Sequence, residues 1–331
     1  MHTHKLGSSH LKVSALGIGL AALGRPGYIN LGHADDLQKN YDTESMQKRA
    51  CRVLDAAYAG GVRYFDAARS YGKAEQFLGN WLASRFPEPG SAAVGSKWGY
   101  TYTAGWQVQA EKHEVKEHTL PVLKSQYQES RSNLGAYLDL YQIHSATLDS
   151  RVLENIDVLK ELARIKSEGL LIGFSVSGPQ QALVIQTALD IKVDGRRLFD
   201  SLQVTWNILE RSTTQVLREA HEMGVGIIVK EALANGRLTD KNSDPDDAAK
   251  LGVLEEEAQR LNATVDGLAL AAVLANPWAD VVLSGAARVE HLESNLKAVD
   301  VAYDGQAENR LFKLVEDPGV YWETRSRLAW N

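Results

Sequence analysis

Eight short apolar segments recur along the chain, and segments with helical spacing of apolar residues separate them. Strands that alternate with helices form a parallel sheet with right-handed crossovers, either a closed barrel or an open doubly wound sheet. The count of eight, with polar residues at several strand ends, favours an α/β fold of the (β/α)8 TIM barrel class. The expected strands are residues 15–19, 62–66, 92–97, 138–143, 171–175, 201–205, 226–230 and 281–284.

The 331 residues suffice for two average domains or for one large barrel with insertions, and we expect a single barrel domain over residues 1–331. Residues 6–13 alternate around a Gly-Ser-Ser turn, which predicts an N-terminal β-hairpin before the barrel. Long loops are expected after strands 1, 3 and 7, at residues 24–41, 99–116 and 238–248. All three would lie on the face where barrel enzymes place their active sites.

Four chemically active side chains lie where predicted strands end: Asp66, Tyr71 five places later, Lys97 and His144. The pKa of a tyrosine phenol is about 10, and a nearby cation lowers it. We expect Lys97 to supply that charge and Asp66 to hold Lys97 in place. His144 would then orient a substrate oxygen. The alternative, an ordinary buried ion pair beside a core tyrosine and a core histidine, explains each residue alone better than it explains all four together.

The segment "GGVRYFDAARSYGKAEQFLGNWL" resembles the signature of the aldo-keto reductase family, with Ala67 in place of the usual Thr. The resemblance continues over nearly the whole chain, from "LGSSHLKVSALGIG" to "ESNLKAVD". It implies reversible hydride transfer between a nicotinamide dinucleotide and a small-molecule carbonyl or alcohol. By position it also implies that Tyr71 is the general acid/base, Lys97 its partner, Asp66 the carboxylate bonded to Lys97, and His144 the orienting donor.

The resemblance further implies a site for the nicotinamide half of the cofactor. Ser175 and Gln203 match residues that bond the carboxamide, with Val176 in place of the usual Asn. Lys230 stands where many members of the family stack an aromatic ring on the nicotinamide, and Gly19 is also expected to contact the cofactor.

Other segments match the pyrophosphate and adenosine sites of the family. The loop whose backbone amides approach the pyrophosphate would carry Leu233, Asn235 and Gly236. In "LSGAARVEHLESN", Arg288 and His291 would bind the 2′-phosphate of NADP(H), and Asn295 would bond the adenine. The expected cofactor is therefore NADP(H), with NAD(H) as the less favoured possibility.

Aromatic residues at the first two long loops predict an aromatic pocket mouth. Tyr28, Trp98, Tyr100 and Trp106 are expected to contact substrate, although such residues also commonly pack their own loop. No metal site is expected, because the histidines lack a second ligand set at a metal-binding spacing.

The composition limits other classes of function. A net charge of −6 argues against a general nucleic-acid surface. No apolar run approaches the ~18 residues that a membrane span needs, and residues 1–5 lack the apolar stretch of a secretory signal. The single cysteine, Cys51, excludes an intramolecular disulfide, so we expect a cytoplasmic location. The sequence leaves the substrate, the direction of reaction and the oligomeric state open.

Two further functions are compatible with the same barrel. One is a cofactor-sensing regulatory subunit, since the resemblance includes potassium-channel β subunits. The other is a Schiff-base lyase that uses Lys97 or Lys230 as its amine. Four intact reactive positions favour the oxidoreductase over both.

Overall fold

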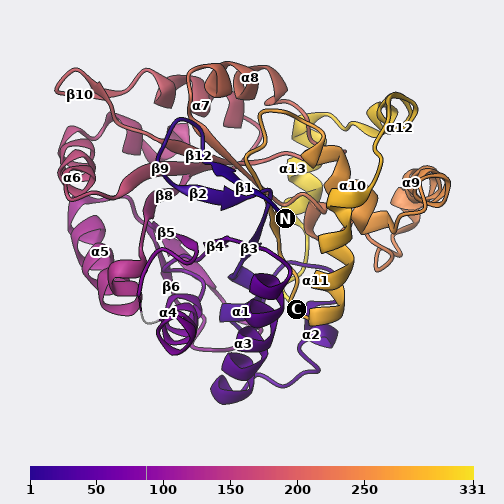
Figure 1. Ribbon diagram of the computed structural model, residues 1–331, viewed down its shortest axis with the longest axis horizontal. Coiled ribbons are helices and arrows are strands. Elements are labelled where there is room, and N and C mark those ends of the chain that lie inside the picture. Colours follow the sequence, from indigo (N-terminus) through magenta and orange to yellow (C-terminus); the bar gives the residue numbers. More distant parts are fainter. Residues whose placement is uncertain (87) are drawn as a thin grey trace.

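The computed structural model describes residues 1–86 and 88–331, and its centre is a closed barrel of eight parallel strands (Figure 1). Around the barrel the order is β12, β13, β14, β3, β4, β5, β8 and β9. The predicted TIM barrel is confirmed, and the last three predicted strands match at both ends. In chain order the strands are β3 (Leu16–Gly19), β4 (Tyr64–Asp66), β5 (Ala93–Trp98), β8 (Leu140–Ala146), β9 (Leu171–Val176), β12 (Ser201–Thr205), β13 (Gly226–Lys230) and β14 (Val281–Ser284).

Helices surround the barrel and connect consecutive strands, as parallel pairing requires (Figure 1). The α-helices are α1 (Ala21–Gly24), α2 (His33–Asp36), α3 (Thr43–Ala59), α4 (Ala74–Arg85), α5 (Leu120–Leu134), α6 (Ile156–Ser167), α7 (Gln181–Leu189), α8 (Thr214–Glu222), α9 (Ala248–Arg260), α10 (Val265–Leu274), α11 (Val289–Leu296), α12 (Gly305–Leu311) and α13 (Pro318–Ser326). Short 3-10 helices are η1 (Gly135–Tyr137), η2 (Leu148–Ser150), η3 (Val152–Glu154), η4 (Ala234–Gly236), η5 (Pro245–Asp247), η6 (Lys297–Asp300) and η7 (Phe312–Leu314).

The predicted N-terminal hairpin is present as β1 (Thr3–Lys5) and β2 (Lys12–Ser14), which pair antiparallel. It closes the end of the barrel at which the strands begin, because Leu6, Leu11 and Val13 are buried in one cluster with strand residues such as Tyr64 and Ile228. The opposite end, where the strands finish, is thereby left for the site.

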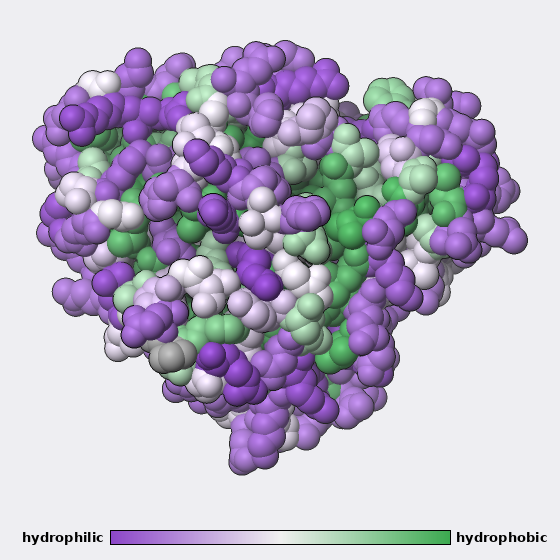
Figure 2. Space-filling view, viewed as in Figure 1, coloured by the Kyte–Doolittle hydropathy of each residue, from purple (hydrophilic) through white to green (hydrophobic). Residues whose placement is uncertain are grey.

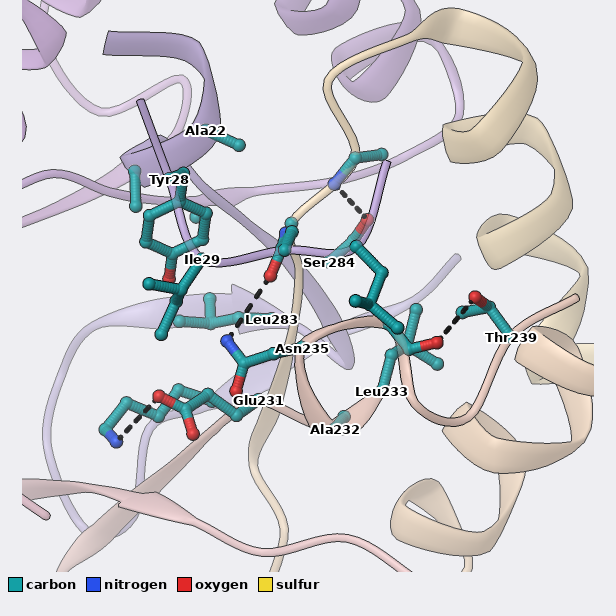
Figure 3. Close-up of a pocket in the computed structure, with 18 of the residues that line it drawn as sticks. Ala22, Tyr28, Ile29, Glu231, Ala232, Leu233, Asn235, Thr239, Leu283 and Ser284 are labelled. Carbon is teal, nitrogen blue, oxygen red and sulfur yellow. Dashed lines mark hydrogen bonds and ion pairs between the residues drawn. The ribbon is translucent and has the colours of Figure 1, made fainter. Parts of the chain in front are cut away.

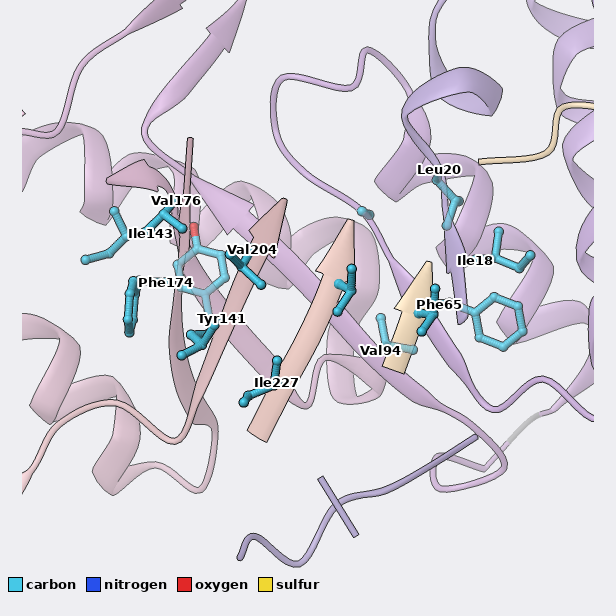
Figure 4. Close-up of a cluster of buried hydrophobic side chains, with 14 of the residues drawn as sticks. Ile18, Leu20, Phe65, Val94, Tyr141, Ile143, Phe174, Val176, Val204 and Ile227 are labelled. Atoms are coloured by element: carbon cyan, nitrogen blue, oxygen red, sulfur yellow. The ribbon is translucent and has the colours of Figure 1, made fainter. Parts of the chain in front are cut away.

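Successive side chains of a strand point to opposite sides, so the strands contribute to one core outside the barrel and another inside it. Phe65 and Val94 point outward into the large cluster that joins barrel and helices (Figure 4). Their neighbours Tyr64 and Ala93 point inward and pack with the hairpin. Asp66 follows Tyr64 by two residues and so faces the interior as well, where the Tyr64 hydroxyl donates to Asp66 Oδ1 at 3.2 Å.

All three predicted long loops follow the expected strands. The loop after β3 carries α2, and the loop after β5 carries an antiparallel pair, β6 (Tyr100–Tyr102) and β7 (Glu114–Lys116). The loop after β13 contains η5. A further small pair, β10 (Lys192–Val193) and β11 (Arg196–Arg197), precedes β12.

The molecular face in Figure 2 is covered mainly by hydrophilic side chains, and apolar residues reach it in a band beside α10. No helix in the described part of the chain combines the length and the apolar character that crossing a membrane requires.

One close approach between backbones sets the position of the loop that carries Tyr71. Gly24 accepts a 2.8 Å hydrogen bond from the Lys73 backbone N–H. A Cβ on Gly24 would overlap the Tyr71 carbonyl oxygen and lie 2.5 Å from the Ala74 Cβ. Only glycine therefore allows the end of α1 to pack this tightly on the Tyr71 loop.

We expect Gly24→Ala to lower the free energy of unfolding by about 1–3 kcal/mol, since the added methyl group overpacks rigid backbone. Gly252→Ala in α9 is the matched control, because its Cβ would meet no atom within 4 Å. Replacing a helical glycine there should stabilise by about 0.5–1 kcal/mol. Urea denaturation of both variants measures the difference, and equal stabilities would contradict the tight contact.

Candidate active site

A cavity of about 990 Å³ opens at the end of the barrel where the strands finish. Its walls come from the loops after β3, β5, β13 and β14, from α9 to α11, and from the last residues of the chain. Figure 3 shows the parts of these walls that follow β3 and β13 and the end of β14. Asp66, Tyr71 and His144 line one part of it, while Thr264, Asp266 and Asn295 line another. The cavity thus connects the predicted reactive residues to the predicted adenosine site.

Lys97 and Asp66 form a buried ion pair beneath the cavity, with side chains 0% and 2% exposed. Lys97 Nζ donates to the Asp66 carboxylate and to the Ala67 carbonyl oxygen, the latter at 2.9 Å. Asp66 Oδ1 also accepts from Gln203 Nε2 at 3.0 Å. Burial lowers the pKa of Lys97, and the adjacent Asp66 opposes that shift. The pair is held as the sequence predicts.

Tyr71 lies directly beside this pair. Lys97 Nζ is 4.9 Å from the centroid of the Tyr71 ring, and the ring packs edge-on against His144 with centroids 5.5 Å apart. Tyr71 lines the cavity. Its proton is therefore available to a molecule bound there.

The sequence led us to expect a lowered pKa for Tyr71, whereas the net shift of its pKa in this pocket is upward. Burial raises the pKa of Tyr71 well above its ordinary value, and the Asp66 charge raises it further. The physical reason is the removal of the phenol from water, and Asp66, which holds Lys97, adds a negative charge beside Tyr71. Tyr71 consequently keeps its proton at neutral pH.

His144 lies at the cavity wall in its neutral form. Burial, followed by the charges of Lys97 and Arg25, holds the pKa of His144 well below its ordinary value. Its Nδ1 lies 3.4 Å from the Ser70 hydroxyl, and its backbone oxygen lies 2.9 Å from His118 Nε2. A neutral imidazole fixed through Nδ1 can present Nε2 as a hydrogen-bond donor without adding charge.

The residues predicted for the nicotinamide half divide into two groups. Gly19, Gln203 and Lys230 line the cavity. Lys230 donates to the Thr205 hydroxyl at 2.5 Å, and burial lowers its pKa to about 8. Ser175 does not reach the cavity wall: it is fully buried, and its hydroxyl accepts the Ser145 backbone N–H at 2.7 Å. Its predicted contact with a carboxamide therefore has no support in this structure.

The predicted pyrophosphate loop lies at the cavity as a left-handed turn. Leu233, Asn235 and Gly236 all line the cavity, and φ is +56° at Asn235 and +96° at Gly236. Successive residues in such conformations turn their N–H groups toward one side, which suits an anion. Asn235 Oδ1 is buried without a partner among the described residues. The Asn30 side chain of the first long loop approaches Asn235 Nδ2 at 3.3 Å.

Among the residues predicted for the adenosine half, His291 and Asn295 line the cavity and Arg288 does not. Asn295 accepts from the Ser284 hydroxyl at 2.6 Å and donates to Asp266 at 2.7 Å. Arg288 pairs with Glu290 at 3.2 Å and faces a separate pocket of about 110 Å³. The predicted grip of Arg288 on a 2′-phosphate is thus absent from this arrangement.

Two of the four predicted substrate aromatics reach the cavity, Tyr28 and Tyr100. Trp98 is fully buried and packs edge-on against His118 at 5.5 Å, so it is part of the core. Trp106 lies outside the cavity, and its Nε1 donates to the Tyr41 carbonyl oxygen at 2.6 Å. The alternative interpretation, that such residues pack their loops, fits Trp106, whereas Trp98 belongs to the core.

The cavity also contains charged residues that sequence reasoning missed. Arg25 pairs with Glu114 at 2.9 Å, and Arg325 Nε donates to Glu231 at 2.8 Å. Trp330, near the C-terminal end, lies over Arg25 at 4.9 Å. None of these residues follows a motif, because each pair joins segments far apart in sequence. The position of Arg25, shortly after the first strand, was the one available signal.

These residues fit an extended dinucleotide. Gly19 leaves the end of β3 without a side chain, and the nearest atom to a Cβ there would be 3.7 Å away. Polar groups lie at both ends of the cavity, with the left-handed turn at Asn235 between them. Across the described residues, no cluster of three or more His, Cys, Asp or Glu side chains is placed to hold a metal ion.

Comparison with known proteins gives one consistent family. A family model described as "Aldo/keto reductase family" matches residues 15–316. An uncharacterized oxidoreductase, YqkF of Bacillus subtilis, is 24% identical, and the alignment covers 98% of this chain and all of the relative. The L-glyceraldehyde 3-phosphate reductase of Escherichia coli O157:H7 is 24% identical over 89% of this chain and 86% of its own length.

A solved structure has the same fold. The aldo-keto reductase AKR11C1 from Bacillus halodurans, solved in a holo form, superposes with a TM-score of 0.73 at 25% sequence identity. The superposition covers 96% of this chain and 97% of that chain. The barrel and its surrounding helices are therefore shared over nearly the full length of both proteins.

We expect Lys97→Met to lower the free energy of unfolding by about 3–5 kcal/mol, because it leaves the Asp66 carboxylate buried without its cation. The double variant Asp66→Asn/Lys97→Met should regain part of that loss, since the amide stays hydrogen-bonded and no charge remains. Urea unfolding of the two variants measures the difference. A single variant as stable as the parent, or a double variant that regains nothing, would contradict the buried pair.

Proposed function

The chain belongs to the aldo/keto reductase family, and from that premise we propose that it transfers hydride reversibly between a nicotinamide dinucleotide and a carbonyl or alcohol substrate. The observation that carries the proposal is the convergence of Asp66, Tyr71, Lys97 and His144 at one part of the cavity. We also propose that residues 1–331 act as one barrel domain. A reduced nicotinamide, when bound, supplies the hydride.

In the proposed reduction, this chain's residues deal with the negative charge that develops on the substrate oxygen. As the new C–H bond forms, the carbonyl electron pair moves to oxygen, and the Tyr71 hydroxyl gives its proton to that oxygen. Neutral His144 donates a hydrogen bond to the same atom. Lys97 lies close enough to stabilise the Tyr71 phenolate that remains. The reverse steps oxidise an alcohol.

Burial and the Asp66 charge raise the pKa of Tyr71, so the phenol of the ligand-free protein carries its proton. A phenol that keeps its proton at neutral pH can donate it to substrate without prior protonation. Oxidation would instead require the ionised phenol, with Lys97 beside it. The L-glyceraldehyde 3-phosphate reductase among the relatives supports an aldehyde as one class of substrate for testing.

We propose NADP(H) as the preferred dinucleotide. Its 2′-phosphate would be bound by residues other than Arg288. The cation Lys241 and the imidazole of His291 line the cavity near its adenosine part, and both lie beside Asp36, at 2.6 Å and 3.6 Å. A 2′-phosphate bound there would add an anionic partner for Lys241, whereas the 2′-hydroxyl of NAD(H) would not.

We expect Tyr71→Phe to reduce kcat by about 10³-fold while cofactor Kd stays within about threefold, because only the proton donor is removed. Tyr127→Phe is the matched control: its hydroxyl bonds Glu168 on the outside of the barrel, so turnover should stay at the parental level. The measurement is nicotinamide absorbance with a panel of aldehydes, ketones and sugars. Full activity in the Tyr71 variant would refute the assignment.

The same assay separates the other functions. Tight dinucleotide binding without turnover of any substrate would favour a cofactor-sensing subunit. Irreversible trapping of a carbonyl substrate by borohydride, lost in Lys230→Met, would favour a Schiff-base lyase.

We expect Lys241→Met to raise KM for NADPH by about tenfold and to leave KM for NADH nearly unchanged, since a charge-assisted contact to phosphate contributes roughly 1.5–3 kcal/mol. Steady-state kinetics with both cofactors checks this. Equal effects on the two cofactors would assign Lys241 to loop packing, and a parental preference for NADH would overturn the choice of NADP(H).

A further inference from the structure

Two ion pairs form a polar wall in the part of the cavity beside Tyr71. Arg25 Nη1 donates to Glu114 at 2.9 Å, and Arg325 Nε donates to Glu231 at 2.8 Å. All four charged side chains line the cavity. Within each pair the positive and the negative charge balance, so the polar wall offers hydrogen-bonding groups and adds no net charge of its own.

The polar wall lies close to the reacting part of the site. The Arg25 guanidinium carbon is 5.3 Å from the centroid of the Tyr71 ring. Burial dominates the raised pKa of Tyr71, and Glu114 and Glu231 lie near enough for their charges to add to it. Figure 3 shows Tyr28 and Glu231 among the side chains that line this pocket. A substrate whose carbonyl oxygen reaches Tyr71 therefore has its remaining atoms beside the two pairs.

One acceptor and one donor of the polar wall remain open to a bound molecule. The side chains of Glu114 and Arg325 are 25% and 26% exposed, whereas those of Arg25 and Glu231 are 3% and 8% exposed. A carboxylate only accepts hydrogen bonds and a guanidinium only donates them. A hydroxyl group does both, so it can bond either of the two open side chains.

Contacts of the last residues of the chain hold the polar wall in place. Tyr28 and Asn331 exchange two backbone hydrogen bonds of 3.1 Å. The Trp330 ring stacks on His113 with centroids 3.8 Å apart, and its own centroid lies 4.9 Å from the Arg25 guanidinium carbon. The polar groups are therefore fixed before a substrate binds, which favours a substrate that matches them.

The chemistry of the polar wall distinguishes between classes of substrate. An apolar group placed against it would remove water from charged side chains and give no hydrogen bond in return, which is unfavourable. A phosphate or carboxylate would meet guanidinium groups that are already paired, each with a carboxylate beside it that repels a second anion. Uncharged hydroxyl groups instead replace the hydrogen bonds of the displaced water.

We propose that the substrate is a small, uncharged, polyhydroxylated aldehyde or ketone, whose hydroxyl groups beyond the carbonyl bond Glu114 and Arg325. Glu114 accepts from one hydroxyl and Arg325 donates to another, so these two side chains determine specificity. The substrate is small because the same cavity of about 990 Å³ also has to hold the dinucleotide. This assignment rests on the proposed function and names the substrate class of the same site.

The first test compares three-carbon aldehydes that differ only in hydroxyl groups: glyceraldehyde, lactaldehyde and propanal. We expect kcat/KM of the parent to fall by at least about tenfold from glyceraldehyde to propanal, with lactaldehyde between them, because a site built to bond a hydroxyl rejects the analogue that lacks it. Benzaldehyde and glyceraldehyde 3-phosphate should also be poorer substrates than glyceraldehyde. Any of propanal, benzaldehyde or the phosphate ester performing as well as glyceraldehyde would overturn the assignment.

The second test uses Arg325→Met and Glu114→Gln. Each should lower kcat/KM for glyceraldehyde by about tenfold more than for propanal, since each weakens a charge-assisted bond to a hydroxyl that propanal lacks. The intrinsic reactivity of the two aldehydes cancels in the ratio between variant and parent. Equal losses for both aldehydes in both variants would assign the ion pairs to loop packing alone and overturn the specificity role. If Arg325→Met does not fold, Glu114→Gln still decides.

Arg85→Met is the matched control. Arg85 in α4 bonds Asp55 in α3 through Nε and Nη2, both at 3.0 Å, in an exposed pair outside the cavity. Removing this arginine should leave the ratio of the two kcat/KM values at the parental level, and a ratio that falls as far as in Arg325→Met would contradict a specific role of the polar wall.

A binding measurement separates this assignment from the proposed function. Saturation-transfer NMR with glycerol, the product of glyceraldehyde reduction, needs no turnover. We expect the affinity for glycerol to fall by about tenfold in Arg325→Met, through the loss of one charge-assisted hydrogen bond. Equal affinities in variant and parent would overturn the assignment. Absence of turnover of every carbonyl compound with either nicotinamide would instead refute the proposed function, while the glycerol result would still decide whether the polar wall binds hydroxyl groups.

Discussion

The buried pair of Lys97 and Asp66 is the interaction on which the rest of the site depends. Closure of the barrel places β4 next to β5, with Asp66 in register with Gly95, and this brings the two charges together inside the strand ends. Two charges removed from water cost several kcal/mol each unless they are paired and fully hydrogen-bonded. The Tyr64 hydroxyl, the Gln203 amide and the Ala67 carbonyl oxygen complete that bonding. Tyr71 is held beside a rigid, nearly neutral group.

Further ion pairs join the loops that surround Tyr71 and the cavity. Arg25 and Glu114 come from the loops after β3 and β5, and Arg325 and Glu231 join the C-terminal helix to the end of β13. Lys241 and Asp36 connect the loop after β13 to the first loop in the same way. Each of these ion pairs bridges two separate segments, so the walls of the cavity are held in place while their charges largely balance. The electrostatics of the site therefore depend on loop packing as much as on the barrel.

The strands and the positions of the four reactive side chains could be predicted from the sequence. The direction in which several other side chains point could not. Trp98 follows Lys97 by one residue, so alternation along β5 sends it to the outer core when Lys97 faces the interior. Ser175 is placed as expected in β9 but bonds the Ser145 backbone, which the sequence does not bring near it. Arg288 pairs with Glu290, two residues away, and faces a different pocket. A motif identifies the position of a residue, whereas its contacts depend on register and on neighbours from other segments.

Local periodicity determined the eight strands, the N-terminal hairpin and the three long loops, because strand and turn preferences act over a few residues. The same short-range information placed Asp66, Tyr71, Lys97 and His144 at strand ends. Only the tertiary structure decided the charge that Tyr71 experiences, because Arg25, Glu114 and Glu231 are brought beside it by closure of the barrel and its loops. Coulombic interactions depend on distance in space, and no local pattern in the chain records that distance.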